Sequence, residues 1–104
     1  MDARKKLLGF LDEKVFQPAL KTNPSRDSTP GERKLLASVQ KRVRGTQIRY
    51  YERYSTAAEV KDRFLEDLQS KFGQDLAADM WQLHMTRFED MVDEFKALCD
   101  SLGV

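Results

Sequence analysis

Three T-x-x-E motifs constrain the fold of this chain more than any other sequence feature. A threonine at such a position accepts a hydrogen bond from the amide three residues on, and the glutamate there can bond back to the cap, so each motif marks the start of a helix. Apolar side chains recur at helical spacing after each motif, and no stretch alternates as a half-buried strand does. The pattern predicts an all-α fold. The three motifs are Thr29 with Glu32, Thr56 with Glu59, and Thr86 with Glu89.

The periodicity predicts four to five helices in a mostly antiparallel bundle, all within one domain, residues 1–104. The first helix covers about residues 3–16 and ends or kinks before Pro18, because proline disfavours helical geometry in the residue before it. Turn-forming residues fill positions 21–29, so a mobile loop is expected there. Gly73 leaves open whether the third and fourth helices are continuous. Further helices are expected at residues 31–54, 57–72, 74–84 and 87–102.

Charge divides the chain into a basic and an acidic half, which the net charge of +1 conceals. Residues 1–56 contain thirteen basic and six acidic side chains, a balance of +7, whereas residues 57–104 contain five basic and eleven acidic ones, a balance of −6. Two interpretations remain open. Either the halves pack together and compensate at their rims, as neighbouring helices of bundles do, or the basic half binds a polyanion or an acidic partner.

The expected helix at residues 31–54 carries most of the basic charge. It holds seven basic and two acidic side chains, a net +5. At about 100° per residue its apolar side chains fall in one arc, which predicts the buried face. That arc contains Leu35, Leu36, Val39, Val43, Tyr50 and Tyr54. The candidate partner contacts of this helix combine cations with one apolar and one aromatic side chain. They are Lys41, Arg42, Arg44, Ile48, Arg49, Tyr51 and Arg53.

These side chains support two classes of function. The stretch from Arg49 to Tyr54 interleaves cations with aromatic rings, the combination that contacts phosphates and stacks on bases, although Tyr50 and Tyr54 are also suited to core packing. Ile48, apolar in a basic surround, favours protein binding instead. Aromatic and thioether side chains are enriched at protein interfaces. A second candidate protein interface therefore comprises Met80, Trp81 and Met85, with core filling as the alternative for the tryptophan.

No catalytic constellation is recognisable in the sequence. One histidine, His84, and one cysteine, Cys99, provide too few ligands for a zinc site, and the sequence contains no phosphate-binding glycine loop or serine elbow. Carboxylates crowd the C-terminal half, which leaves a carboxylate-lined metal enzyme as a distant alternative to a solvated acidic face. We therefore expect no catalytic residues, no cofactor and no bound metal.

Targeting signals are equally sparse. The apolar run near the N-terminus is too short for a signal-peptide core, and no stretch approaches the roughly 20 apolar residues of a membrane helix. A single cysteine excludes an intrachain disulfide and fits a reducing compartment. We expect a cytoplasmic, non-enzymatic protein that makes no membrane contact and binds a protein partner or itself, with nucleic-acid binding as the alternative.

Overall fold

The computed structural model describes residues 2–70 and 87–104, and every regular element in these two ranges is a helix. The prediction of an all-α fold is confirmed for this part of the chain. The elements are α1 (Ala3–Leu11), the π-helical segment η1 (Asp12–Phe16), α2 (Gln17–Lys21), α3 (Pro30–Arg53), α4 (Ala57–Gln69) and α6 (Arg87–Leu102). None of these helices has the length and apolar content needed to cross a membrane.

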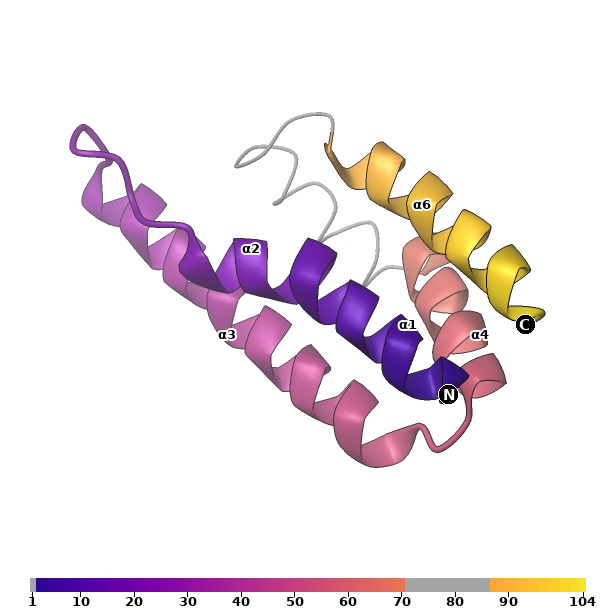
Figure 1. Ribbon diagram of the computed structural model, residues 1–104. Coiled ribbons are helices and arrows are strands. Elements are labelled where there is room, and N and C mark those ends of the chain that lie inside the picture. The colour runs from indigo at the N-terminus through magenta and orange to yellow at the C-terminus, as the bar shows by residue number, and fades with distance from the viewer. Residues whose placement is uncertain (1, 71–86) are drawn as a thin grey trace.

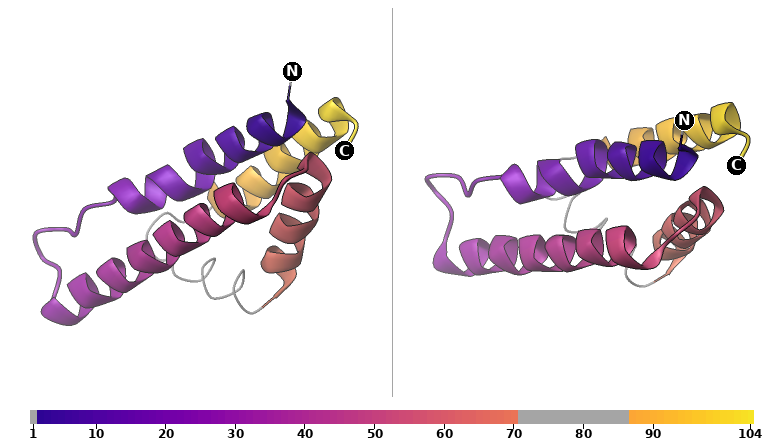
Figure 2. Two further views of the ribbon diagram at one scale, coloured as in Figure 1. Left: turned by 90° about the horizontal axis from the view of Figure 1, so that it is seen from below. Right: turned by 60° about the horizontal axis from the view of Figure 1, so that its bottom comes forward.

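The helices from α1 to α2 form one continuous helical stretch that lies alongside α3 (Figure 1). The loop at residues 22–29 reverses the chain between them. A short link then leads from α3 into α4, which packs against α1. The last helix, α6, also packs against α1, and it lies on the α1 side of the molecule while α3 lies on the other side (Figure 2, right).

The first helical stretch continues past Pro18 to Lys21, so of the two predicted alternatives, an end or a kink before Pro18, the end near residue 16 is wrong. Proline has no N–H, and in a regular helix its ring would crowd the carbonyl four residues earlier. The wider turn of η1 lies immediately before Pro18 and accommodates this mismatch. The side-chain amide of Gln17 donates to Asp12 Oδ1 at 3.2 Å across that turn.

The two capping motifs within the described residues mark helix starts as predicted. The amide of Glu32 donates to Thr29 Oγ1 at 3.2 Å, and the amide of Glu59 donates to Thr56 Oγ1 at 3.1 Å. The return bond of the second motif goes to the residue before the cap, because the amide of Ser55 donates to Glu59 Oε2 at 3.4 Å. The third motif begins at Thr86, which lies outside the described residues.

The C-terminal end of α4 comes earlier than predicted, at Gln69 instead of residue 72. Ser70 has extended backbone angles, φ −88° and ψ 173°, and its hydroxyl donates to the Asp67 carbonyl at 3.0 Å. This local side-chain bond competes with helix continuation. The predicted helix at 74–84 and its boundary at Gly73 lie outside the described residues.

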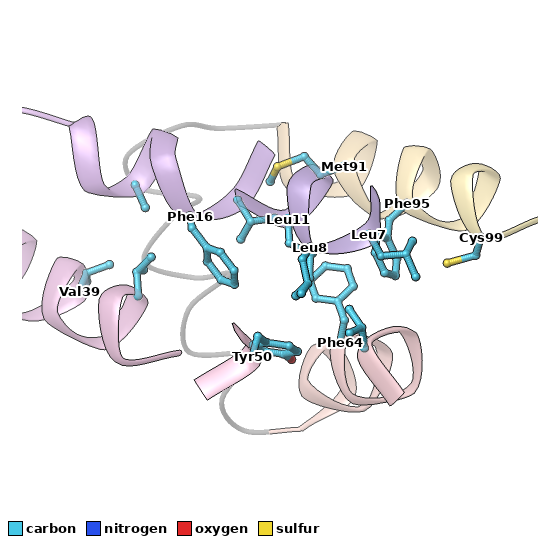
Figure 3. Packing of buried hydrophobic residues seen from close by; sticks show 14 residues of the cluster. Leu7, Leu8, Leu11, Phe16, Val39, Tyr50, Phe64, Met91, Phe95 and Cys99 are labelled. Atoms are coloured by element: carbon cyan, nitrogen blue, oxygen red, sulfur yellow. The ribbon is translucent and has the colours of Figure 1, made fainter. Parts of the chain in front are cut away.

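Aromatic contacts in the core join α1, η1, α3, α4 and α6 in pairs. The Phe95 ring of α6 meets Phe64 of α4 edge-on, with ring centroids 4.5 Å apart (Figure 3). It also lies 5.7 Å from the ring of Phe10 of α1. Tyr50 of α3 lies 6.1 Å from Phe16 of η1. The buried apolar side chains among the described residues are Leu7, Leu8, Leu11, Val15, Phe16, Ala19, Leu36, Val39, Val43, Tyr50, Val60, Phe64, Met91, Phe95 and Cys99.

The predicted buried face of α3 is correct except at its N-terminal end. Leu36, Val39, Val43 and Tyr50 are buried and Tyr54 packs against the core, but Leu35 is 48% exposed. The beginning of α3 lies beside α2, and α4 and α6 cover only the opposite end of the molecule (Figure 1). The buried stripe is therefore narrower there, and Leu35 at its edge faces water.

Candidate functional site

The outward face of α3 holds the central candidate contacts predicted from the sequence. Its buried side is occupied by Leu36, Val39, Val43, Thr46 and Tyr50. The opposite side presents side chains that recur every three, four or seven residues and are all exposed. We call this surface the α3 face. It comprises Lys34, Lys41, Arg44, Gly45, Ile48 and Glu52, and the three cations outnumber the one carboxylate.

Ile48 is the apolar centre of the α3 face. Its side chain is 48% exposed, a large fraction for isoleucine. Lys41, Arg44 and Glu52 lie on the same side of the helix, one or two turns away. Exposed single apolar residues are common on protein surfaces, so the position of Ile48 within a basic surround matters more than its exposure alone.

Gly45 leaves open space beside Ile48. A Cβ atom built at Gly45 would meet no described atom within 4 Å, so packing within the described part of the chain does not require glycine there. Glycine inside a helix nevertheless costs about 1 kcal/mol relative to alanine. Packing among the described residues therefore does not explain its presence in helix α3.

Three candidate residues flank this face. Arg42, Arg53 and Tyr51 are exposed, and the Tyr51 ring is 40% exposed. Tyr51 borders a shallow hollow of about 420 Å³ against Leu8 and Gly9 of α1. Partial burial and the nearby carboxylate of Asp12 raise the pKa of its hydroxyl.

Arg49 differs from the other candidates because it faces α4. Its Nη2 atom lies 3.9 Å from Asp67 Oδ2, and the side chains of Arg49 and Asp67 are 39% and 20% exposed. The hydroxyl of Tyr50 donates to the same carboxylate oxygen. Burial, followed by this hydrogen bond and the negative charge of Asp67, holds the pKa of Tyr50 far above its ordinary value. This trio links α3 to α4.

Two polar side chains that the sequence patterns did not single out hold α3 in place. The Arg4 guanidinium of α1 donates to the carbonyls of Tyr51, at 2.9 Å, and Tyr54, so it satisfies carbonyls at the C-terminal end of α3 and complements the helix dipole there. Near the middle of α3, the Gln40 amide donates to the carbonyl of Thr22 at 2.8 Å and caps α2. No local motif identifies such contacts, because their partners are distant in sequence.

Lys34 and Gly45 were not among the candidates predicted from the sequence. Lys34 lies fourteen residues before Ile48, almost four helical turns, so the same angular count that placed Ile48 opposite the core would have placed it on this face. Gly45 was recognisable as a weak point of the helix, but only the structure shows the open space above it.

Carboxylates dominate the other side of the molecule. The exposed acidic side chains of α6 are Glu89, Asp90, Asp93, Glu94 and Asp100. Between described residues of the two halves, one ion pair lies within 4.0 Å, Arg49 with Asp67.

The remaining candidates add no second site. Met80, Trp81, Met85 and His84 lie outside the described residues. Cys99 is buried, and burial raises the pKa of its thiol, which disfavours the reactive thiolate. Within residues 2–70 and 87–104, no three histidine, cysteine or acidic side chains form a group that could hold a metal ion.

No protein-family model, no curated protein and no solved structure matches this chain.

Proposed function

We propose that this chain is a small non-enzymatic helical module that binds a protein partner through the α3 face. Ile48 carries this proposal, because it presents apolar surface at the centre of a basic rim. The adjacent Gly45 leaves space beside it among the described residues. Protein interfaces combine an apolar centre with a polar rim in the same way. The partner that fits is a surface with a small apolar contact surrounded by carboxylates.

The setting of α3 supports the proposal. Its inner side is anchored by the core, its C-terminal carbonyls by Arg4, and its flank by the Gln40 contacts with the end of α2. A helix held along its inner side and at its C-terminal end loses little conformational freedom when a partner binds, so less of the binding energy is spent on ordering.

The proposal also covers the arrangement of the helices and the cellular compartment of the protein. We infer one domain, residues 1–104, built as a four- to five-helix, mostly antiparallel bundle with one long basic helix as its binding element. The chain reversals at residues 22–29 and 54–56 support this arrangement. A cytoplasmic location is supported by Cys99, the only cysteine, which is a buried thiol.

A nucleic acid is the second candidate partner, favoured by the exposed cations Lys41, Arg42, Arg44 and Arg53 on one helix. Such side chains suit phosphate contacts. Base stacking has less support. Tyr50 is buried and packs edge-on against Tyr54, with ring centroids 4.9 Å apart, so of these three tyrosines Tyr51 alone exposes much of its ring.

Retention of lysate proteins on the immobilised chain, with and without nuclease, separates these candidates. We expect nuclease-resistant retention that falls more than tenfold, or about 1.4 kcal/mol, in I48E and in K41E/R44E, because each places negative charge opposite an acidic partner. K6E/K14E changes the net charge as much as K41E/R44E does, at exposed positions of α1 and η1, and should retain proteins as the wild type does. Nuclease-sensitive, salt-steep retention would favour nucleic acid, and equal retention by all variants would contradict the proposal.

A further inference from the structure

We propose that a second copy of this chain is the partner, with its α6 seated on the α3 face of the first. This inference rests on the proposed function and names the occupant of the same site. Charge complementarity within one sequence carries it: the α3 face is basic, and the outward side of α6 is acidic. We call the latter the α6 face. It comprises Asp90, Asp93, Ala97 and Asp100, all exposed.

The α6 face provides the small apolar contact that Ile48 requires. The opposite side of α6 is buried through Met91, Phe95 and Cys99. Ala97 therefore points away from the core of its own chain, between exposed carboxylates. The short side chain of Ala97 and the missing side chain of Gly45 allow the two helices to approach closely, with Ile48 filling the space between them.

The spacing of charges is the same on both faces. Lys41 and Arg44 precede Ile48 by seven and four residues, and Asp90 and Asp93 precede Ala97 by seven and four residues. When the helices run parallel and Ile48 lies against Ala97, cations and carboxylates therefore occupy the same levels, about 10 Å and 6 Å from the apolar contact at 1.5 Å per residue. Lysine and arginine side chains are long enough to reach the carboxylates of the facing helix.

The opposite orientation is less favourable. With the helices antiparallel, Glu52, four residues after Ile48, comes level with Asp93, four residues before Ala97. Like charges facing each other across an interface oppose binding strongly. In the parallel orientation Glu52 comes within one residue of the level of Asp100, but two cations, Lys41 and Arg44, are level with carboxylates. The charge pattern therefore favours the parallel orientation on balance.

The positions of the two faces determine the type of assembly. The helix α3 packs against α2 and η1, and α6 packs against α1, so the faces lie on different sides of one molecule (Figure 2, right). A contact between different faces is head-to-tail and leaves one face of each kind open at the ends. The mass should therefore grow beyond that of a dimer as concentration rises.

Charge exchange between the two faces tests this contact. Light scattering of the full chain at rising concentration should show a mass that increases for the wild type and falls with added salt. K41E/R44E alone and D90K/D93K alone should stay monomeric, because like charges then meet. An equimolar mixture should associate again, since each reversed face finds a complementary one. D90N/D93N removes the two carboxylate charges without placing cations near the start of α6. It should weaken association at least tenfold.

Other outcomes would overturn the inference. A wild type that stays monomeric at all concentrations would do so, as would a mixture that stays monomeric although dichroism shows both variants folded. Wild-type-like association of either variant alone would place the contact elsewhere. Retention of other proteins that depends on Ile48, found with a monomeric wild type, would refute the second copy as partner and leave the proposed function standing. Retention insensitive to I48E would refute the proposed function itself.

Discussion

Phe95→Ala is expected to lower the free energy of unfolding by about 3–5 kcal/mol. Phe95 is fully buried on α6, and its ring packs against Phe64 of α4 and Phe10 of α1. Truncation removes this apolar contact and leaves a cavity where three helices meet, which the surrounding side chains can fill only in part. Urea unfolding followed by far-ultraviolet dichroism measures the loss.

The control is a neighbouring exposed position on the same helix. Lys96→Ala removes an exposed side chain and should change the free energy of unfolding by less than about 0.5 kcal/mol. A cost of less than about 1 kcal/mol for Phe95→Ala, against the range for buried phenylalanine, would contradict the placement of α6 on the core.

Replacing Tyr50 should give the second large effect, and two variants separate its ring from its hydroxyl. Tyr50→Ala removes a ring that is 1% exposed and should cost about 3–5 kcal/mol, as for other buried aromatic residues. Tyr50→Phe keeps the ring but leaves the half-buried carboxylate of Asp67 without its phenol donor, which should cost about 1–3 kcal/mol. Urea unfolding at neutral pH compares the two variants.

The pH dependence of stability identifies the hydroxyl contribution. The pKa of Tyr50 is raised in the folded state above its ordinary value of 10.0. Below pH 10 the phenol is protonated in both states; above it the unfolded chain releases a proton that the folded chain keeps. Stability should therefore fall above pH 10 by up to about 1.4 kcal/mol per pH unit for this group. In Tyr50→Phe, stability should fall less steeply with pH. Part of the fall should remain, because the pKa of Tyr51 is also raised in the folded state. Equal slopes for wild type and variant would refute this role of Tyr50.

Local sequence patterns predicted the parts of the fold that depend on neighbouring residues. Thr29 and Thr56 mark helix starts, and the period of α3 places Val39, Val43 and Tyr50 inward and Ile48 outward. The errors arise where local preferences meet a tertiary context. A π-helical turn lets the first helix pass Pro18, and Leu35 is exposed because no helix of residues 2–70 and 87–104 covers its side of α3.

The contacts of Arg4, Gln40 and Asp67 were not predictable in the same way. Their partners lie 50, 18 and 17 residues away in sequence. Which distant carbonyl or hydroxyl a polar side chain reaches depends on how the helices pack, and no spacing rule encodes that. In the candidate site, too, some positions were predictable from local patterns and others depend on how the helices pack. Periodicity placed Ile48 on the outward side, but it did not indicate that Arg49 turns toward Asp67.

A photo-crosslinking residue placed at position 48 tests most directly whether the α3 face binds protein. We expect protein adducts in nuclease-treated lysate or in the concentrated pure chain, formed from position 48 but not from the same residue placed at Ala58, an exposed position on α4. Adducts of the pure chain should map to residues 87–104 of a second copy. Absence of adducts from position 48, or equal yields from both positions, would contradict a binding role for this face.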